Sequence, residues 1–465
     1  MNFNRELIGS TTCVRLAAPL GDGVQQAVNI VVILDVSGSM NDGSKLSNVL
    51  LSLEQLLTYL RDDDTLTVVP FSDDVRRPFP VNQEPCTATG KALIQEKLVR
   101  ITANGNTHLE AAIRSASEVL ALRPPGPLKS AVLLLTDGAA TVGELDHTKL
   151  VEFQAANLAT YPDALFCTVG YGDDHQAELC RRLALNGPYS IVRSGEDVGA
   201  VIGDLLGGLR TVAATSVRLT IPPHVRQKTG FKMLDQQICV GNLVSGGNQI
   251  ILLTDVSPED TIGLHYTLAD GTVHDVANVV VSGPSAEVQE TGGEALLRCE
   301  VLEIMEYARR HLVSGSPSAD ASILGQSLAL KARLEAMASN SAVALLLREL
   351  HKAHTYLSMP APPPALSRHL TNQLSQHTEY LGTARGIMSS SYDEDEDPLS
   401  RNTSIFSSSV QRAMSSGMAS AVRSATVPGS QNPRSPSLSL PPPPPSSMGP
   451  SALGRSPSMA PSFPF

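Results

Sequence analysis

The feature that most constrains the fold is an apolar run, residues 30–34, which ends in Asp35 and is followed by a Ser-Gly-Ser turn at 37–39. The run is mostly β-branched, which is typical of a strand buried on both faces of a parallel sheet. Residues 45–60 then have the apolar periodicity of a helix. Such a strand delivers its carboxylate and hydroxyls to the carboxyl edge of an α/β sheet, where ligands bind in these folds. Hard oxygen donors of this kind suit Mg²⁺ or Mn²⁺ better than zinc or copper.

The rest of residues 29–210 continues the alternation of strands and helices, which predicts a doubly wound, mostly parallel sheet. The expected strands are 30–35, 66–71, 132–136, 165–170 and 189–192. The expected helices are 45–60, 91–100, 109–122, 145–159, 176–185 and 197–209.

Two later loops complete a pattern that begins with Asp35-x-Ser37-x-Ser39. Thr107 lies in a loop that opens a helix, and Asp137 follows an apolar strand. Together the three parts resemble the metal-ion-dependent adhesion site of a von Willebrand factor A (vWA) domain, which has a Rossmann-like fold. The resemblance implies that Mg²⁺ or Mn²⁺ is bound directly by hydroxyls and through waters by the two carboxylates, the set being Asp35, Ser37, Ser39, Thr107 and Asp137. A metal-free relic on the same fold is the alternative.

The remaining segments differ in pattern from the α/β domain. Residues 1–28 hold a candidate strand at 11–20. Residues 211–290 contain short strands and turn signals typical of a small antiparallel β-sandwich, with strands expected at 216–221, 249–254, 261–268 and 273–281. Residues 291–382 form a helical segment expected to pack on the sandwich, with apolar faces at Leu297, Val301, Ile304 or Met305, Ala308 and Leu312, and at Leu324, Leu328, Leu334 and Met337.

Residues 383–465 are rich in serine and proline, and we expect this tail to be disordered because it cannot bury enough apolar surface. The tail contains two copies of Arg-Ser-Pro-Ser, at 434–437 and 455–458, and a run of five prolines at 441–445. A solvated tail of biased composition is one interpretation. A docking segment for proline-reading or phospho-reading domains is the other.

Charge and cysteine content narrow the class of protein. The net charge of −11 with no basic block argues against a nucleic-acid surface. No stretch reaches the roughly 18 apolar residues of a membrane span, and the first ten residues have no apolar run typical of a signal peptide. Six scattered cysteines without a CxxC pair indicate reduced thiols. We therefore expect a cytoplasmic or nuclear protein that binds neither nucleic acid nor membrane.

The order of segments is also similar to that of a plant family of ubiquitin ligases with RING and vWA domains. The likeness runs over about residues 29–414 and includes residues 298–303, 386–391 and 409–414. A RING needs eight Cys or His zinc ligands in paired spacing, and the sequence has no such set. The resemblance therefore implies a relative without ligase activity of its own, with a link to ubiquitin pathways left open.

The function expected from these features is a metal-dependent adaptor, not an enzyme, whose bound ion captures an Asp or Glu side chain of a protein partner. One alternative is a scaffold that binds through its helical segment and tail while the vWA domain is inert. A metal-dependent hydrolase is the other, with His108 as its only titratable candidate beside the site.

Overall fold

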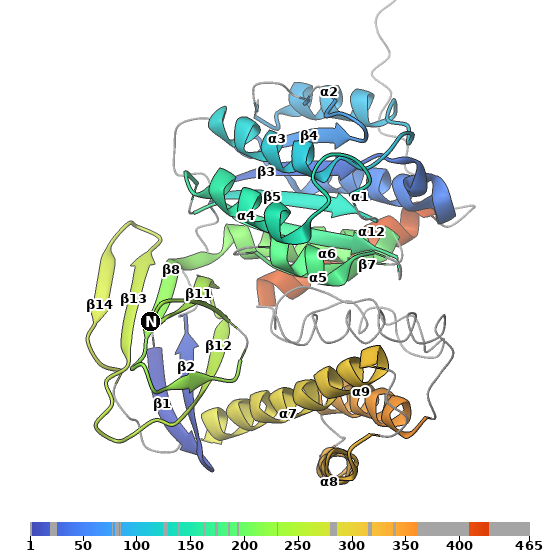
Figure 1. Cartoon of the computed structure of the whole chain (residues 1–465). Coiled ribbons are helices and arrows are strands. Elements are labelled where there is room, and N and C mark those ends of the chain that lie inside the picture. Colours follow the sequence, from blue (N-terminus) through green and yellow to red (C-terminus); the bar gives the residue numbers. More distant parts are fainter. Residues whose placement is uncertain are drawn as a thin grey trace, which may run out of the picture. The chain divides into compact units, whose positions relative to one another are not determined.

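The computed structural model describes the chain in sixteen stretches, and all statements below concern these residues (Figure 1). They are 2–18, 26–76, 78–79, 83, 85–123, 129–137, 140–161, 163–172, 175–184, 187–192, 195–229, 231–279, 286–314, 319–337, 341–359 and 409–426.

A five-stranded parallel sheet with strand order β4-β3-β5-β6-β7 organises the first large domain. Its strands are β3 (Val28–Asp35), β4 (Thr65–Phe71), β5 (Lys129–Thr136), β6 (Leu165–Tyr171) and β7 (Tyr189–Val192). The five strands expected from the sequence are confirmed. The interior position of β3, between β4 and β5, explains its unbroken apolar run, because a strand between two parallel neighbours is covered on both faces.

Helices cover both faces of this sheet. They are α1 (Lys45–Tyr59), α2 (Ala88–Leu98), α3 (Leu109–Ala121), α4 (His147–Leu158), α5 (Ala177–Leu183) and α6 (Gly195–Arg210), with a short 3₁₀ helix η1 (Gly38–Ser44) before α1. Alternate residues of β3 enter two separate cores. Ile30 and Val32 pack in the cluster that includes α1 and α6, whereas Val31 and Ile33 pack with α3. The doubly wound arrangement is therefore confirmed.

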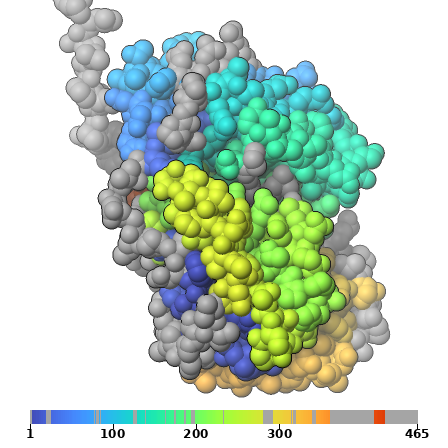
Figure 2. Space-filling view, turned by 90° about the vertical axis from the view of Figure 1, so that its left-hand side faces the viewer, coloured from blue at the N-terminus to red at the C-terminus, as the bar shows by residue number. Residues whose placement is uncertain are grey.

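Two antiparallel sheets form the sandwich. One has the order β1-β2-β12-β9 and the other β10-β11-β8-β13-β14. Their strands are β1 (Asn2–Ile8), β2 (Thr11–Ala17), β8 (Val212–Thr220), β9 (Arg226–Gln227), β10 (Lys232–Leu234), β11 (Gln237–Val244), β12 (Asn248–Thr254), β13 (Gly263–Leu268) and β14 (Val273–Val276). Figure 2 shows the surface of the β13–β14 hairpin in yellow.

The sandwich is assembled from both sides of the parallel-sheet domain in the sequence. Cys13 of β2, which precedes that domain, pairs with Leu252 of β12, which follows it. The two connections also meet, since the Gln26 backbone N–H donates to the Arg210 carbonyl oxygen at 3.2 Å. The parallel-sheet domain is thus an insertion within the sandwich. The expected strand at 11–20 is confirmed as β2. Strands β1, β9, β10 and β11 were not predicted: β9 and β10 have only two and three residues, β1 has four polar residues among seven, and Gly241 and Asn242 interrupt the apolar residues of β11.

Three helices follow the sandwich: α7 (Ala286–Ser314), α8 (Ala321–Glu335) and α9 (Ser341–Ser358). The predicted face of α7 is confirmed, since its apolar residues are buried in one cluster with α9, and both alternatives at the third position, Ile304 and Met305, belong to it. The second predicted face is correct in part: Leu334 is buried, but Leu328 and Met337 are 53% and 44% exposed. The helices pack on the sandwich as expected, because Cys13 and Leu252 share a core with Ala295 and Cys299. None of the described helices is long and apolar enough to cross a lipid bilayer.

A further helix, α12 (Ser409–Thr426), lies within the tail and packs against α6 (Figure 1). The prediction that residues 383–465 are disordered is therefore wrong for residues 409–426. The physical reason is tertiary: Met418 and Ala419 are buried in the same core as α1 and α6, which offsets the poor helix propensity of the segment. The rest of the predicted disordered tail and both Arg-Ser-Pro-Ser copies lie outside the described residues.

Candidate metal centre

Asp35 occupies the end of the interior strand β3 and is fully buried. Its Oδ1 accepts the Ser37 backbone N–H at 2.8 Å, and its Oδ2 accepts the Thr136 hydroxyl at 2.6 Å. Burial raises the pKa of Asp35 to about 6, and the hydrogen bonds from Thr136 and Ser37 oppose that rise. Both oxygens are therefore fixed by the protein, which suits a carboxylate that orients a metal site through water.

The first loop follows β3 and carries Ser37 and Ser39, and the third loop follows β5 and carries Asp137. The hydroxyls of the first loop and the carboxylate of the third loop are in direct contact. Ser37 Oγ and Ser39 Oγ lie 3.2 Å apart, and Ser39 donates to Asp137 Oδ1 at 2.8 Å. The other oxygen of Asp137 accepts from Lys45 Nζ at 2.6 Å, and this carboxylate side chain is fully buried. Four of the five predicted residues are thus brought together at one edge of the sheet by hydrogen bonds.

The second loop is joined to this edge through its backbone. The Gly38 N–H donates to the Gly105 carbonyl oxygen at 3.0 Å, which places the loop of Thr107 beside the first loop. Thr107 is buried, and its backbone N–H donates to Thr141 Oγ1 at 2.8 Å. Thr107 therefore lies between the first and third loops, although none of its described hydrogen bonds joins it to the other four predicted residues.

The donor set fits a hard divalent cation. It consists of two carboxylates and three hydroxyls, all oxygen ligands of the kind that Mg²⁺ and Mn²⁺ prefer. The Lys45 ammonium already forms an ion pair with Asp137, as expected for a buried carboxylate, which needs a positively charged partner. With a divalent ion bound, Ser37, Ser39 and Thr107 would supply hydroxyl oxygens, and Asp35 and Asp137 would orient water. The ion would supply an electrophilic position for an incoming carboxylate.

Three residues of the site were not identified from the sequence: Lys45, Thr136 and Thr141. Thr136 precedes Asp137 and could have been found as the last inward-facing polar residue of its strand. Lys45 had been assigned only to the start of a helix. The available signal was its place in the sequence, since Lys45 directly follows the short 3₁₀ helix η1 that begins within the Ser-Gly-Ser turn.

His108 belongs to the second loop and is held by the segment after β4. Its backbone N–H donates to the Ser72 carbonyl oxygen at 2.9 Å, and its Nδ1 lies 3.0 Å from the Asp73 carbonyl oxygen. The side chain therefore links the second loop to the segment after β4.

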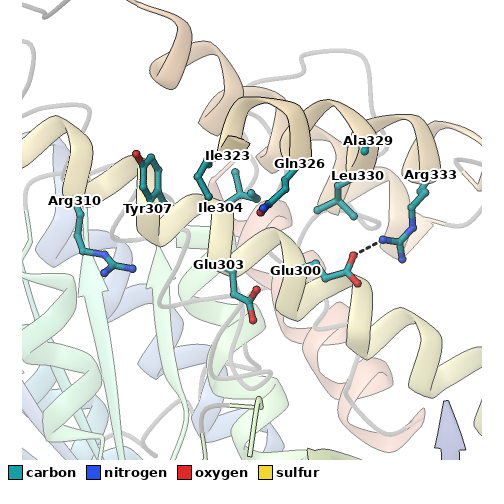
Figure 3. Close-up of a pocket in the computed structure, with 10 residues that line it drawn as sticks. All are labelled: Glu300, Glu303, Ile304, Tyr307, Arg310, Ile323, Gln326, Ala329, Leu330 and Arg333. Carbon is teal, nitrogen blue, oxygen red and sulfur yellow. Dashed lines mark hydrogen bonds and ion pairs between the residues drawn. The ribbon is translucent and has the colours of Figure 1, made fainter. Parts of the chain in front are cut away.

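A separate hollow of about 430 Å³ lies between α7 and α8 (Figure 3). Its floor includes Ile304 and Leu330, and an ion pair between Glu300 and Arg333, at 2.6 Å, stands beside it. Of the charged residues that line the hollow, Glu300 and Arg333 already form an ion pair with each other. The hollow lies on other helices than those of the candidate metal centre.

Comparison with known proteins agrees with this geometry. Residues 30–139 match the family model of the von Willebrand factor type A domain. The chain is 27% identical over 241 residues to inter alpha-trypsin inhibitor heavy chain 4 of Mus musculus, covering 48% of this chain and 25% of that protein. It is also 27% identical over 214 residues to the Escherichia coli protein YfbK, covering 45% of this chain and 36% of that protein. The matched part of the chain thus covers well under two thirds of the length of these curated relatives.

Two solved structures have the same fold. A von Willebrand factor type A protein from Catenulispora acidiphila aligns with a TM-score of 0.55 and 17% identity over 79% of this chain and 90% of its own. The ArnB paralog VWA2 from Sulfolobus acidocaldarius aligns with a TM-score of 0.51 and 14% identity over 82% of this chain and 97% of its own. The parallel sheet, the loops at its carboxyl edge and these similarities lead to one conclusion: the chain contains a von Willebrand factor type A domain.

Proposed function

We propose that the protein is an intracellular, metal-dependent adaptor that captures an acidic side chain of a partner protein. The observation that supports it best is the convergence of Ser37, Ser39 and Asp137 on one another, with Asp35 fixed behind them. A Mg²⁺ or Mn²⁺ ion at this edge keeps an open position because the two carboxylates act through water. A partner's Asp or Glu fills that position.

Lys45 sets the resting state of this proposed site. Its ammonium neutralises Asp137 when no divalent ion is bound, and the ion competes with it for the same carboxylate. The buried carboxylate therefore always has a cation beside it.

Metal binding is tested with Mn²⁺ alone, by titrating the full chain and following free Mn²⁺ by electron paramagnetic resonance. Wild type should bind one ion, and Ser39→Ala should bind at least about tenfold more weakly because a direct ligand is lost. Asp42→Asn is the matched control, because Asp42 is an exposed carboxylate in the same loop. Equal affinities for all three chains would refute the site.

Partner capture is tested next on arrays of peptides that present glutamate or, at the same position, glutamine. The chain should bind glutamate peptides in Mg²⁺, lose them in EDTA, and ignore the glutamine set. If Mn²⁺ binds as proposed but no peptide distinguishes glutamate from glutamine, capture of an acidic partner fails while the metal site stands.

We also propose that such capture serves a ubiquitin pathway, with the chain presenting a partner to a separate ligase. The resemblance to RING and vWA ligases supports this. In a reconstituted reaction containing ubiquitin, activating enzyme and conjugating enzyme, the chain alone should form no ubiquitin conjugates. Conjugates formed by the chain alone would contradict it. The proposal would also be contradicted if, in a reaction that contains a ligase, the partner were ubiquitinated to the same extent with the Ser39→Ala variant as with wild type.

A further inference from the structure

Helix α12 contacts α6 along a line where its backbone approaches glycines. A Cβ atom at Gly203 would lie 2.5 Å from the Met414 carbonyl oxygen, and one at Gly199 would lie 3.2 Å from the Met418 carbonyl oxygen. On the other helix, a Cβ at Gly417 would lie 3.1 Å from the Tyr59 hydroxyl of α1. The two helices therefore pack at backbone distance, and no added volume fits between them.

Ser415 lies in the middle of this contact. Its α-carbon would be 2.7 Å from a Cβ at Gly203, and the residue is only 1% exposed. Its Oγ is buried and has no hydrogen-bond partner among the described residues. A buried hydroxyl without a partner destabilises the docked state, so packing alone does not account for a serine here.

An acidic side chain stands one turn away along the same interface. Asp204 of α6 accepts from Gln411 Nε2 at 3.3 Å, and Gln411 precedes Ser415 by one helical turn. Asp204 is itself 7% exposed. A negative group added at Ser415 would enter a buried interface that already contains a carboxylate, which disfavours docking by desolvation and by repulsion.

The helix depends on docking for its order. Five serines and one glycine among its 18 residues lower its helix propensity, and most of the stability of a helix in a protein comes from packing of its apolar face. Fifty residues separate Ser358 at the end of α9 from Ser409 at the start of α12. Undocked α12 is therefore free to become an extended peptide. In that state Arg412 stands three residues before Ser415, a charge pattern that arginine-directed protein kinases select.

We propose that Ser415 is a phosphorylation site and that its modification releases α12 from α6. The kinase acts on the undocked peptide: Ser415 Oγ attacks the γ-phosphorus of ATP, the bond to the bridging oxygen breaks, and ADP leaves. The hydroxyl proton passes to the kinase base. The phosphoserine prevents redocking and leaves the α6 surface uncovered. This inference is independent of the metal centre.

The test is hydrogen exchange of the full chain before and after treatment with an arginine-directed serine kinase and ATP, with the site assigned by mass spectrometry. Ser415→Asp is measured beside Ser420→Asp, which adds the same charge at an exposed position of the same helix. Amides of α12 should be protected in wild type and in Ser420→Asp. Their protection should fall at least about a hundredfold in the phosphorylated chain and in Ser415→Asp.

Arg412→Ala should slow modification of Ser415 at least about tenfold, because the charge recognised by the kinase is lost. Exchange in β3 and β5 of the same samples reports whether the sheet is still folded, which separates undocking from unfolding. Failure of the kinase to modify Ser415, or unchanged protection of α12 after modification, would overturn the proposal. So would loss of protection in β3 and β5 together with α12, or an unprotected α12 in wild type.

Discussion

Lys45 Nζ and Asp137 Oδ2 are 2.6 Å apart, and the Asp137 side chain is completely buried. The ion pair joins the helix after the first loop to the end of β5, across the place where the metal is proposed to bind. A buried carboxylate that lost this partner would remain uncompensated, which is costly.

Lys45→Met should therefore lower the melting temperature of the metal-free chain and increase the benefit of metal. The ion pair is worth roughly 3 kcal/mol when one partner is removed, and Mg²⁺ becomes the only cation left for Asp137. Differential scanning calorimetry with and without Mg²⁺ measures both effects. Lys149→Met is the control, since its ion pair with Glu144 is exposed. An equal Mg²⁺-dependent rise in the variant and in wild type would contradict the competition between Lys45 and the ion.

Asp35→Asn should leave the fold intact but weaken Mn²⁺ binding by about tenfold or more. The amide can accept from the Ser37 N–H and donate to the Thr136 hydroxyl, so neither group loses its partner. Because the pKa of Asp35 is raised to about 6, its contribution to stability falls as the pH rises from about 4 through 6. At pH 7.5 the metal-free variant should therefore melt no lower than wild type. A much lower melting temperature would indicate that the charge is structural.

Asp64→Asn should destabilise the metal-free chain by about 3–5 kcal/mol, because it removes the buried negative charge that lies against the Arg210 guanidinium. Arg210 Nη2 lies 2.6 Å from Asp64 Oδ2, and the side chains are 2% and 0% exposed. Asp64 also accepts the Val28 backbone N–H at 2.9 Å. Urea unfolding measures the change, with Asp63→Asn as control because that side chain is 63% exposed. Similar midpoints for the two variants would show that the buried pair contributes little.

Among the cysteines, Cys239 should react first with iodoacetamide at pH 8. The other five are buried, and burial raises the pKa of Cys13, Cys86 and Cys180 to about 12, which leaves roughly one thiol in ten thousand ionised. Intact mass spectrometry should record one alkylation of the native chain and six in urea. Rapid labelling of Cys13 without urea would mean that the core between the sandwich and α7 opens readily.

The parallel sheet could be predicted because its information is local. Each of its strands is an apolar run followed by a polar turn, and Asp35 and Asp137 mark two of those ends. The positions of the candidate site residues could be predicted for the same reason, as they lie at ends of strands and starts of helices. Lys45 was missed because a lysine at the start of a helix is common, and only the folded chain brings it to Asp137.

The parts that were missed depend on distant contacts. The polar strand β1 is stable because β2 pairs with it and with β12, a partner far away in the sequence. Helix α12 has a composition typical of disorder, and its order comes from the glycines of α6 that allow close approach. Neither of these long-range contacts produces an apolar periodicity or a turn signal within the sequence of β1 or α12.

The insertion of the vWA domain within the sandwich has a consequence for how the protein is made. As the chain leaves the ribosome, the β1–β2 hairpin emerges before the vWA domain, whereas its pairing partner β12 is synthesised after that domain. The vWA domain, whose strands all lie between these two, can fold in the interval as a unit. In the folded domain Gln26 is hydrogen-bonded to Arg210, so the connection that leaves β2 lies beside the connection that enters β8. We therefore expect the sandwich to close only after the vWA domain has been synthesised.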